Sequence, residues 1–321
     1  MTGDGLTGRY RSRAWQTPAD SRQMQALVAR CWRADWPDVH LHAGDVDWWS
    51  VHALGKPPGL EDRIGLWFDG EPDATELVGF AWYSPPLDAD LIVAPGHRTV
   101  TLLGAMTAWI DGQAVRFGPN PAGSRAAPVR IWTVETDDRS NEALASLGFG
   151  PTAVPAFHHF AGRTDELDLT EPPLPDGYRL ATIASDGDVP ARVVAGHAAF
   201  PRSTMTEEAY RFCRTTPLYR PGLDRIIRAP DGTIAAFALA WLDPLSMGVE
   251  LEPVGVHPDH QRRGLGRAVC RAAIRAARDL GGRDILIAAE SGNPASNGLY
   301  ASLGLGLSAR VVAVGRPEAA D

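Results

Sequence analysis

The 321-residue sequence is poor in lysine and cysteine, and each shortage argues against a class of site. Lys56 is its one lysine, so it contains no GxxxxGK(S/T) loop for nucleotide phosphates. Cys31, Cys213 and Cys270 form no CxxC pair and no Cys/His ligand spacing. This argues against a disulfide framework and a structural zinc site. We therefore expect a reduced, cytoplasmic protein that holds no metal.

The sequence also lacks a long apolar run and an excess of positive charge. Its longest apolar stretch, 234–242, is far shorter than the about 20 residues that span a bilayer. Its first residues, Met1 to Asp4, lack the basic and apolar segments of an export signal. With 31 basic and 39 acidic residues the net charge is −8. We expect neither nucleic acid nor membrane as a partner, whereas an amine-bearing partner stays open.

Two parts of the chain repeat each other. The stretch NEALASLGF at 141–149 parallels NGLYASLGL at 297–305, and an apolar strand-like run precedes each copy. A second echo pairs LIVAPGH at 91–97 with VGVHPDH at 254–260, each before a helical stretch. The order strand, loop, helix, strand, helix therefore occurs twice, which predicts an α/β fold in two copies.

An acidic, proline-rich segment separates the two copies. It has no sustained periodicity, which is typical of an exposed linker. We expect an amino-terminal domain at 1–165, a linker at 166–176 and a carboxy-terminal domain at 177–321. Each half also begins alike, with a predicted strand at 10–15 or 178–183 and a predicted helix at 19–34 or 189–200.

The most distinctive local pattern is HPDHQRRGLGR at 257–267, between a predicted strand at 251–256 and a predicted helix. Gly264 and Gly266 permit a tight turn that exposes backbone N–H groups at the helix start, which suits a pyrophosphate. The pattern is not the GxGxxG dinucleotide fingerprint. It resembles the Gln/Arg-x-x-Gly-x-Gly/Ala loop of the GNAT (Gcn5-related) N-acetyltransferases.

The resemblance covers about 65 residues, 250–315, in the family's order of elements. It implies two tandem GNAT folds, each a mixed, mostly antiparallel twisted sheet flanked by helices, and acetyl-CoA as cosubstrate. It also implies coenzyme contacts from Val254, Gly255, Val256, Gln261, Arg262, Arg263, Gly264, Leu265, Gly266, Arg267 and Asn293. Two of these calls have plainer alternatives. Pro253 fits an edge or bulge where the strand splays from its neighbour, which in the family admits the pantetheine arm, and the plainer alternative is a proline that ends the strand. Asn293 before Pro294 also fits a helix cap.

Two side chains match the family's catalytic positions. Glu250 stands where some members place a general base, and Glu252 is the reserve because it shares that face of the strand. Tyr300 stands where many members place the acid that protonates the departing thiolate. The structural alternatives are a surface glutamate and a core tyrosine.

The amino-terminal copy departs from the loop pattern. Aligning the copies sets Thr101 opposite Gly264, Leu103 opposite Gly266 and Leu144 opposite Tyr300. Side chains at the two glycine positions would crowd a pyrophosphate. We therefore expect one catalytic domain, the carboxy-terminal one, beside a degenerate partner.

Nine of the ten tryptophans lie in the amino-terminal half, and the stretch from Asp45 to Trp49 combines two of them with acids. This stretch fits either a docking surface for the other domain or an acceptor pocket for a cationic amine. The predicted function is transfer of acetyl from acetyl-CoA to a primary amine of a small molecule. A non-enzymatic acyl-CoA sensor or interaction module and a protein-lysine acetyltransferase are the alternatives, and homo-oligomer formation stays open.

Overall fold

The computed structural model describes residues 5–7, 9–70, 76–118 and 129–317, and the chain falls into two compact units. The first comprises Met1–Leu41, Gly55–Phe157 and Ala309–Asp321; the second comprises His42–Leu54 and His158–Ser308. This division is not sequential, unlike the one expected from the linker. Helix α2 (Ala43–Ala53) is built into the second unit, and strand β14 (Gly306–Gly315) ends in the first.

The first unit contains a mixed sheet. In order across the sheet, its strands are β1 (Gly5–Thr7), β2 (Tyr10–Ala14), β3 (Ile64–Asp69), β4 (Leu77–Ser84), β5 (Asp88–Val93), β6 (Arg130–Val134) and the end of β14. Strands β5 and β6 run parallel, and the other neighbours run antiparallel. The short β7 (Gly150–Pro151) also pairs with β14. The helices are α1 (Pro18–Asp35), α3 (Leu60–Arg63), α4 (Val100–Phe117) and α5 (Asp138–Ser146).

Helix α1 shows how the sequence sets an element of this unit. Pro18 occupies the first turn, where a missing N–H costs nothing. The Asp20 carboxylate accepts hydrogen bonds from the backbone N–H groups of Gln16 at 2.8 Å and Thr17 at 3.1 Å. Met24 and Leu27 are fully buried on one face. The expected helix at 19–34 is thus present with its start fixed by a cap.

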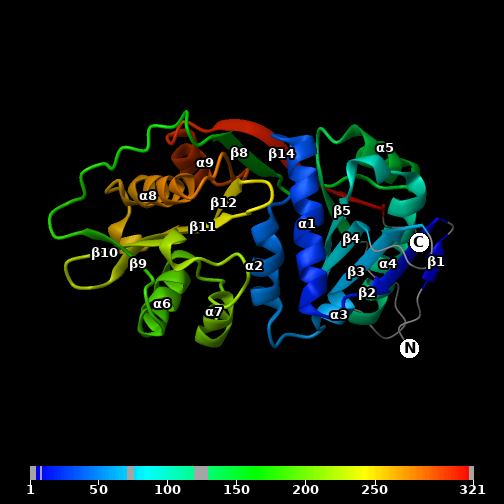
Figure 1. The fold of residues 1–321 in the computed structure, drawn as a ribbon, viewed down its shortest axis with the longest axis horizontal. Helices are drawn as coiled ribbons and strands as arrows, with labels where there is room; N and C mark the ends of the chain where they lie inside the picture. The colour runs from blue at the N-terminus through cyan, green and yellow to red at the C-terminus, as the bar shows by residue number, and fades with distance from the viewer. Residues whose placement is uncertain (1–4, 8, 71–75, 119–128, 318–321) are drawn as a thin grey trace. The chain divides into compact units, whose positions relative to one another are not determined.

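The second unit repeats the plan. In order across its sheet, the strands are β8 (Phe157–Arg163), β13 (Asp284–Glu290), β12 (Gly248–Val256), β11 (Ile234–Leu242), β10 (Asp224–Arg228) and β9 (Arg179–Thr182). Strands β12 and β13 run parallel, whereas β9 to β12 run antiparallel to their neighbours. Its helices, besides α2, are α6 (Val189–Ala199), α7 (Glu207–Cys213), α8 (Leu265–Asp279) and α9 (Pro294–Ala301). Figure 1 shows α8 and α9 on one side of this sheet and α6 and α7 on the other. The expected fold, a mixed and mostly antiparallel sheet flanked by helices, is confirmed.

The core of the second unit forms between the sheet and α8. All nine residues of β11 are buried because helices cover both faces of this strand. Leu265, Val269 and Ile274 of α8 pack into the same core. On its outer face Arg271 forms an ion pair with Asp168 at 3.2 Å, which ties the segment between the two copies to the helix.

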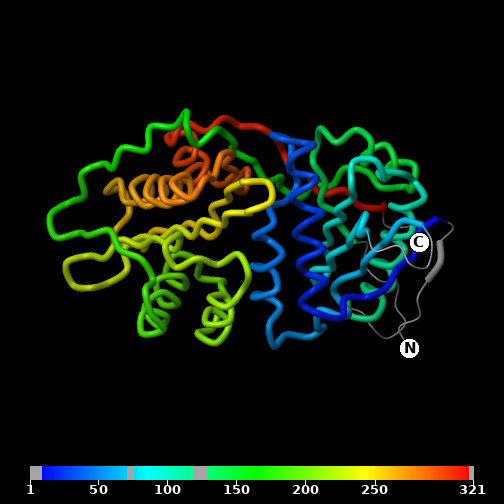
Figure 2. The backbone as a smooth tube through the Cα atoms, in the orientation of Figure 1, coloured from blue at the N-terminus to red at the C-terminus, as the bar shows by residue number. Residues whose placement is uncertain are grey.

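Helix α2 packs beside α7 in the second unit, far from it in sequence (Figure 2, the blue and yellow-green traces). A Cβ on Gly44 would lie 2.5 Å from Cγ of Trp241, so the missing side chain permits close packing of α2 on β11. Among the described residues, no helix is long and apolar enough to cross a membrane.

Candidate active site

A cleft opens in the second unit where β12 and β13 stop pairing. Their parallel pairing runs from Gly248–Asp284 to Glu250–Leu286, although both strands continue further. In β12 the register against β11 shifts so that two residues, Glu252 and Pro253, lie between paired positions opposite one residue of β11. Proline has no N–H for a ladder bond, so a bulge accommodates it. The bulge expected at Pro253 is confirmed.

A cavity of about 560 Å³ occupies this cleft. It is lined by Ala199, Phe200, Val254, Gly255, Val256, Gln261, Arg262, Gly264, Leu265, Gly266, Arg267, Asn293, Ala295, Ser296, Leu299, Tyr300 and Ser302. Ten of the eleven residues expected to contact the coenzyme are in this set. The exception is Arg263, whose guanidinium donates instead to the Tyr178 hydroxyl at 3.1 Å.

The loop before α8 has the conformation that its glycines predict. Gly264 caps the helix with a φ of 78°, a left-handed conformation that favours glycine. A Cβ on Gly266 would lie 3.2 Å from Val256 and 3.3 Å from Leu299, so this turn packs closely on β12 and α9. The N–H groups of the first helical turn therefore open on the cavity without a side chain over them.

Two arginines complete the positive end of this cavity. Arg262 and Arg267 are exposed, line the cavity and form no ion pair with any described residue. A guanidinium pairs well with phosphate oxygens. Together with the helix start, they form a site for a polyanion such as the pyrophosphate of a coenzyme.

Helix α9 supplies two of the expected residues. Asn293 caps it, because its Oδ1 accepts a hydrogen bond from the backbone N–H of Ser296 at 3.1 Å. Tyr300 is buried against Phe160, with ring centroids 5.9 Å apart, and its hydroxyl forms no hydrogen bond with a described residue. Burial raises the pKa of Tyr300, so the hydroxyl keeps its proton and can donate it.

His42 anchors the start of α2 next to β12. Its Nδ1 accepts a hydrogen bond from the backbone N–H of Gly44 at 3.0 Å, and its Nε2 donates to the carbonyl of Gly248 at 3.1 Å. Burial lowers the pKa of His42 to about 4. The imidazole is therefore neutral at pH 7, and its 3.7 Å approach to Glu250 is not an ion pair.

Three carboxyl groups meet below the cleft. Asp45 of α2 and Glu250 and Glu252 of β12 each place an oxygen within 4.8 Å of the other two. Burial, together with the charge of Glu252, holds the pKa of Glu250 well above its usual range. Burial and the charges of both glutamates do the same to the pKa of Asp45.

Glu252 carries the negative charge of this group most readily. Burial raises its pKa, but hydrogen bonds from the side chains of Asp45 and Trp48 oppose that shift. These donors favour the charged form of Glu252.

A second cavity of about 270 Å³ lies beside these acids, still within the second unit. It is lined by Trp48, His52, Arg192, Val193, Gly196, Phe200, Ser203, Met205, Tyr210, Phe237, Glu252 and Pro253. Phe200 also lines the first cavity, and Val254 of that cavity directly follows Pro253 of this one. The two cavities therefore meet at the β12 bulge.

Both roles that the sequence left open for Trp48 stay open, because it lines this cavity and also lies against Trp241 of β11, with ring centroids 6.3 Å apart. Arg192, Phe200 and Tyr210 were not singled out from the sequence. An arginine inside the apolar stretch of α6 is a signal that the sequence displays, although it does not show which way the side chain points.

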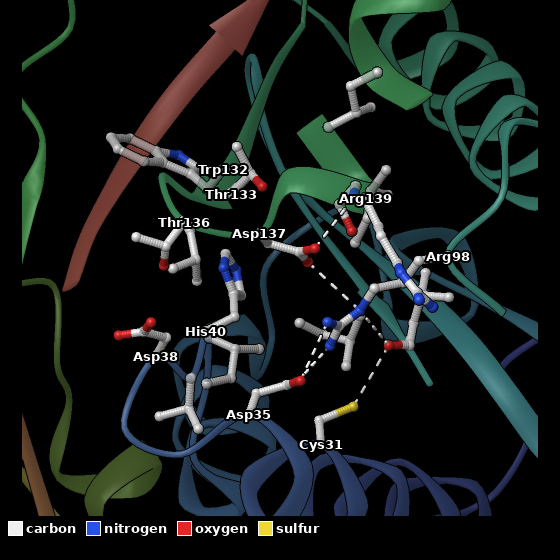
Figure 3. A pocket seen from close by; sticks show the side chains of 18 of the residues that line it. Cys31, Asp35, Asp38, His40, Arg98, Trp132, Thr133, Thr136, Asp137 and Arg139 are labelled. Atoms are coloured by element: carbon white, nitrogen blue, oxygen red, sulfur yellow. Dashed lines mark hydrogen bonds and ion pairs between the residues drawn. The ribbon is translucent and has the colours of Figure 1, made fainter. Parts of the chain in front are cut away.

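The first unit has a corresponding cleft with different chemistry. Strands β5 and β6 pair in parallel from Asp88–Arg130 to Asp90–Trp132, and a cavity of about 390 Å³ follows. Figure 3 shows Arg98 there between two acids. Its Nη1 donates to Asp35 at 3.2 Å, and its Nε lies 3.4 Å from Asp137.

Three further features separate this cleft from its counterpart. Helix α4 is capped by the side chain of Thr99, which accepts from the Leu102 N–H at 3.3 Å. Leu103 and Leu144 line the cavity where the second unit has Gly266 and Tyr300. This cleft thus has neither the bare helix start nor the hydroxyl.

Comparison with known proteins identifies the family. The acetyltransferase (GNAT) family model matches residues 193–305. A mycothiol acetyltransferase of Thermobispora bispora is 29% identical over 303 residues, covering 90% of this chain and 93% of that protein. A second, of Actinosynnema mirum, is 28% identical, covering 90% and 94%.

Two solved structures share the fold over nearly the whole chain. A tandem GNAT protein from the clavulanic acid biosynthesis pathway has a TM-score of 0.65 at 17% identity, covering 97% of this chain and all of that one. A GCN5-related N-acetyltransferase from Sphaerobacter thermophilus has a TM-score of 0.63 at 22% identity, covering 98% of each. Residues 193–305 therefore form a GNAT acetyltransferase domain, which lies in the second unit, while the chain as a whole is similar to mycothiol acetyltransferases and shares the fold of a tandem GNAT protein.

Proposed function

We propose that the second unit transfers acetyl from acetyl-CoA to a primary amine of a small molecule. The observation that carries this proposal is the junction of two unlike cavities at one strand bulge. One cavity has a helix start and unpaired arginines, and the other has a carboxylate. Glu252 and Pro253 face the second cavity while Val254 faces the first. The acyl group and the amine would meet at this junction.

The coenzyme cavity suits each part of acetyl-CoA. The pyrophosphate would lie at the start of α8, with Arg262 and Arg267 beside it. The pantetheine arm would follow the backbone of 254–256, which β13 leaves uncovered. The Arg263 side chain has no part in this proposal.

The chemistry needs a proton acceptor and a proton donor. The amine nitrogen attacks the acyl carbon and loses a proton to a carboxylate, and the C–S bond breaks as Tyr300 gives its proton to the thiolate sulfur. The sequence favours Glu250 as the proton acceptor. The geometry favours Glu252, because it lines the second cavity, here called the acceptor cavity. Glu250 is 4% exposed and lines neither cavity.

The size of the acceptor cavity supports a small acceptor rather than a lysine on a folded protein. Its volume of about 270 Å³ is just below the roughly 300–1,000 Å³ typical of small-molecule sites.

The test is titration of the whole chain with acetyl-CoA by calorimetry, followed by turnover with an amine panel. We expect one coenzyme per chain, since the first unit's cleft lacks the bare helix start. Tyr300→Phe should lower kcat at pH 7 at least tenfold with coenzyme affinity unchanged, while Tyr10→Phe in the first unit should leave both unchanged. Two bound coenzymes, or equal kcat for Tyr300→Phe, would contradict the corresponding part of the proposal.

A further inference from the structure

Arg192 of α6 is a buried charge without an adequate partner. Its side chain is 3% exposed, and its Nε and Nη2 are buried without a hydrogen-bond acceptor. The nearest carboxylate, Asp224, lies 3.8 Å from Nε. The other oxygen of Asp224 accepts hydrogen bonds from Tyr210 at 2.5 Å and Tyr219 at 2.9 Å. Leaving buried N–H donors unpaired is costly, more so when they belong to a charged group.

The guanidinium lies at the acceptor cavity. Arg192 lines that cavity and stacks on Phe237, with Cζ 3.7 Å from the ring centroid. Stacking on an aromatic face stabilises the cation, but the ring accepts no hydrogen bond from the N–H groups in the guanidinium plane. No described residue accepts a hydrogen bond from Nε or Nη2, and a ligand in the cavity that Arg192 lines is one source of an acceptor.

The same cavity has an acid and an apolar wall. Glu252 supplies a carboxylate that suits an amine, whereas Trp48, Phe200 and Met205 offer aromatic and aliphatic surface. A ligand that matches Glu252, Arg192 and the apolar wall carries an amine, an anionic group that accepts hydrogen bonds, and an apolar body.

We propose that the acceptor is an amino acid with an apolar side chain, held by its carboxylate on Arg192 and by its amine on Glu252. The inference rests on the proposed function of this unit as an amine acetyltransferase. A planar guanidinium binds a carboxylate through two parallel hydrogen bonds, so Arg192 selects carboxylate-bearing amines and sets their orientation. The volume of about 270 Å³ equals roughly nine water molecules at about 30 Å³ each, which suits one amino acid.

The experiment compares two amines that differ only in the carboxylate. Acetylation of L-phenylalanine and of phenethylamine by the whole chain is followed through release of the coenzyme thiol. We expect kcat/KM at least tenfold higher for L-phenylalanine. Arg192→Met should reduce that ratio to about two, by raising KM for the amino acid and leaving phenethylamine little changed.

Three further measurements complete the design. Arg192→Lys keeps the positive charge but cannot form two parallel hydrogen bonds, so it should give an intermediate ratio of the two kcat/KM values. This variant can still be measured if Arg192→Met fails to fold. Arg211→Met removes an exposed arginine that pairs with Glu207 and should leave the ratio unchanged. Quenching of tryptophan fluorescence by L-phenylalanine, detected through Trp48, reports binding without any acetyl transfer.

The outcomes separate this inference from the proposed function. Equal use of both amines, or a preference that survives in both Arg192 variants, overturns the inference and leaves the acetyltransferase function standing. Acetylation of neither amine, combined with quenching that disappears in Arg192→Met, supports the site and contradicts the proposed function. No quenching and no acetylation of L-phenylalanine overturns the inference.

Discussion

Trp48→Phe tests which carboxylate accepts the proton. The side chain of Trp48 donates a hydrogen bond to Glu252 and so opposes the rise that burial causes in the pKa of that carboxyl. A hydrogen bond to a charged group is worth about 1.5–3 kcal/mol. At about 1.36 kcal/mol per unit, its loss should raise the pKa of Glu252 by roughly one to two units.

The assay is the pH profile of kcat/KM for one amine. A base acts only when deprotonated, so activity falls as the pH drops through its pKa. If Glu252 is the base, this acidic limb moves upward by one to two pH units in Trp48→Phe, and activity returns at high pH. Phenylalanine preserves the aromatic wall of the cavity, so the position of the limb is the informative quantity rather than its height.

The alternative predicts the opposite sign. If Glu250 is the base, a less ionised Glu252 no longer raises the pKa of Glu250, so the limb stays in place or moves downward. Trp49→Phe, one residue along the same helix and outside the cavity lining, is the matched control and should leave the limb unchanged. An unchanged or lowered limb in Trp48→Phe refutes the assignment to Glu252.

Two further substitutions test the coenzyme site and the buried acids. Gly264→Trp should abolish acetyl-CoA binding in calorimetry, because a side chain there enters the cavity at a φ of 78° that non-glycine residues rarely adopt; undiminished binding would contradict the loop assignment. Glu250→Gln should raise the free energy of unfolding relative to the parent chain progressively as the pH rises above the ordinary pKa of a glutamate. The raised pKa of Glu250 means that the folded state retains a proton that the unfolded state has lost, at a cost of about 1.4 kcal/mol per pH unit. Urea unfolding at pH 5, 6.5 and 8 measures this, and a difference that does not grow with pH would show that Glu250 is ionised in the folded state.

The sequence predicted which residues line the first cavity of the second unit because one continuous segment, 254–267, supplies most of them. The loop at 261–267 depends on glycines and a helix start, which are local properties that a sequence displays directly. The echo of 141–149 in 297–305 likewise revealed two similar folds, since a duplicated chain keeps its spacing.

The acceptor cavity was harder to predict because its residues come from distant segments. Trp48 reaches it from α2, Arg192 from α6 and Glu252 from β12. Nothing local to Arg192 shows that its helix turns that face toward β12, and an arginine in a helix is usually exposed. The non-sequential division of the chain into two units was not predicted for the same reason. The composition of the linker indicates which segment is exposed, but it does not indicate that α2 packs in the second unit.

The second unit includes residues 42–54, which the sequence places in the amino-terminal copy. Asp45 and Trp48 are the donors that oppose the rise in the pKa of Glu252, and His42 fixes the start of their helix on β12. The carboxy-terminal copy alone, 177–321, would lack all three residues while keeping the loop before α8. Under the proposed function, the residues that bind the coenzyme and the residues that donate to Glu252 come from different halves of the chain. Substitutions in the amino-terminal half are therefore expected to change the use of the acceptor and to leave coenzyme binding intact.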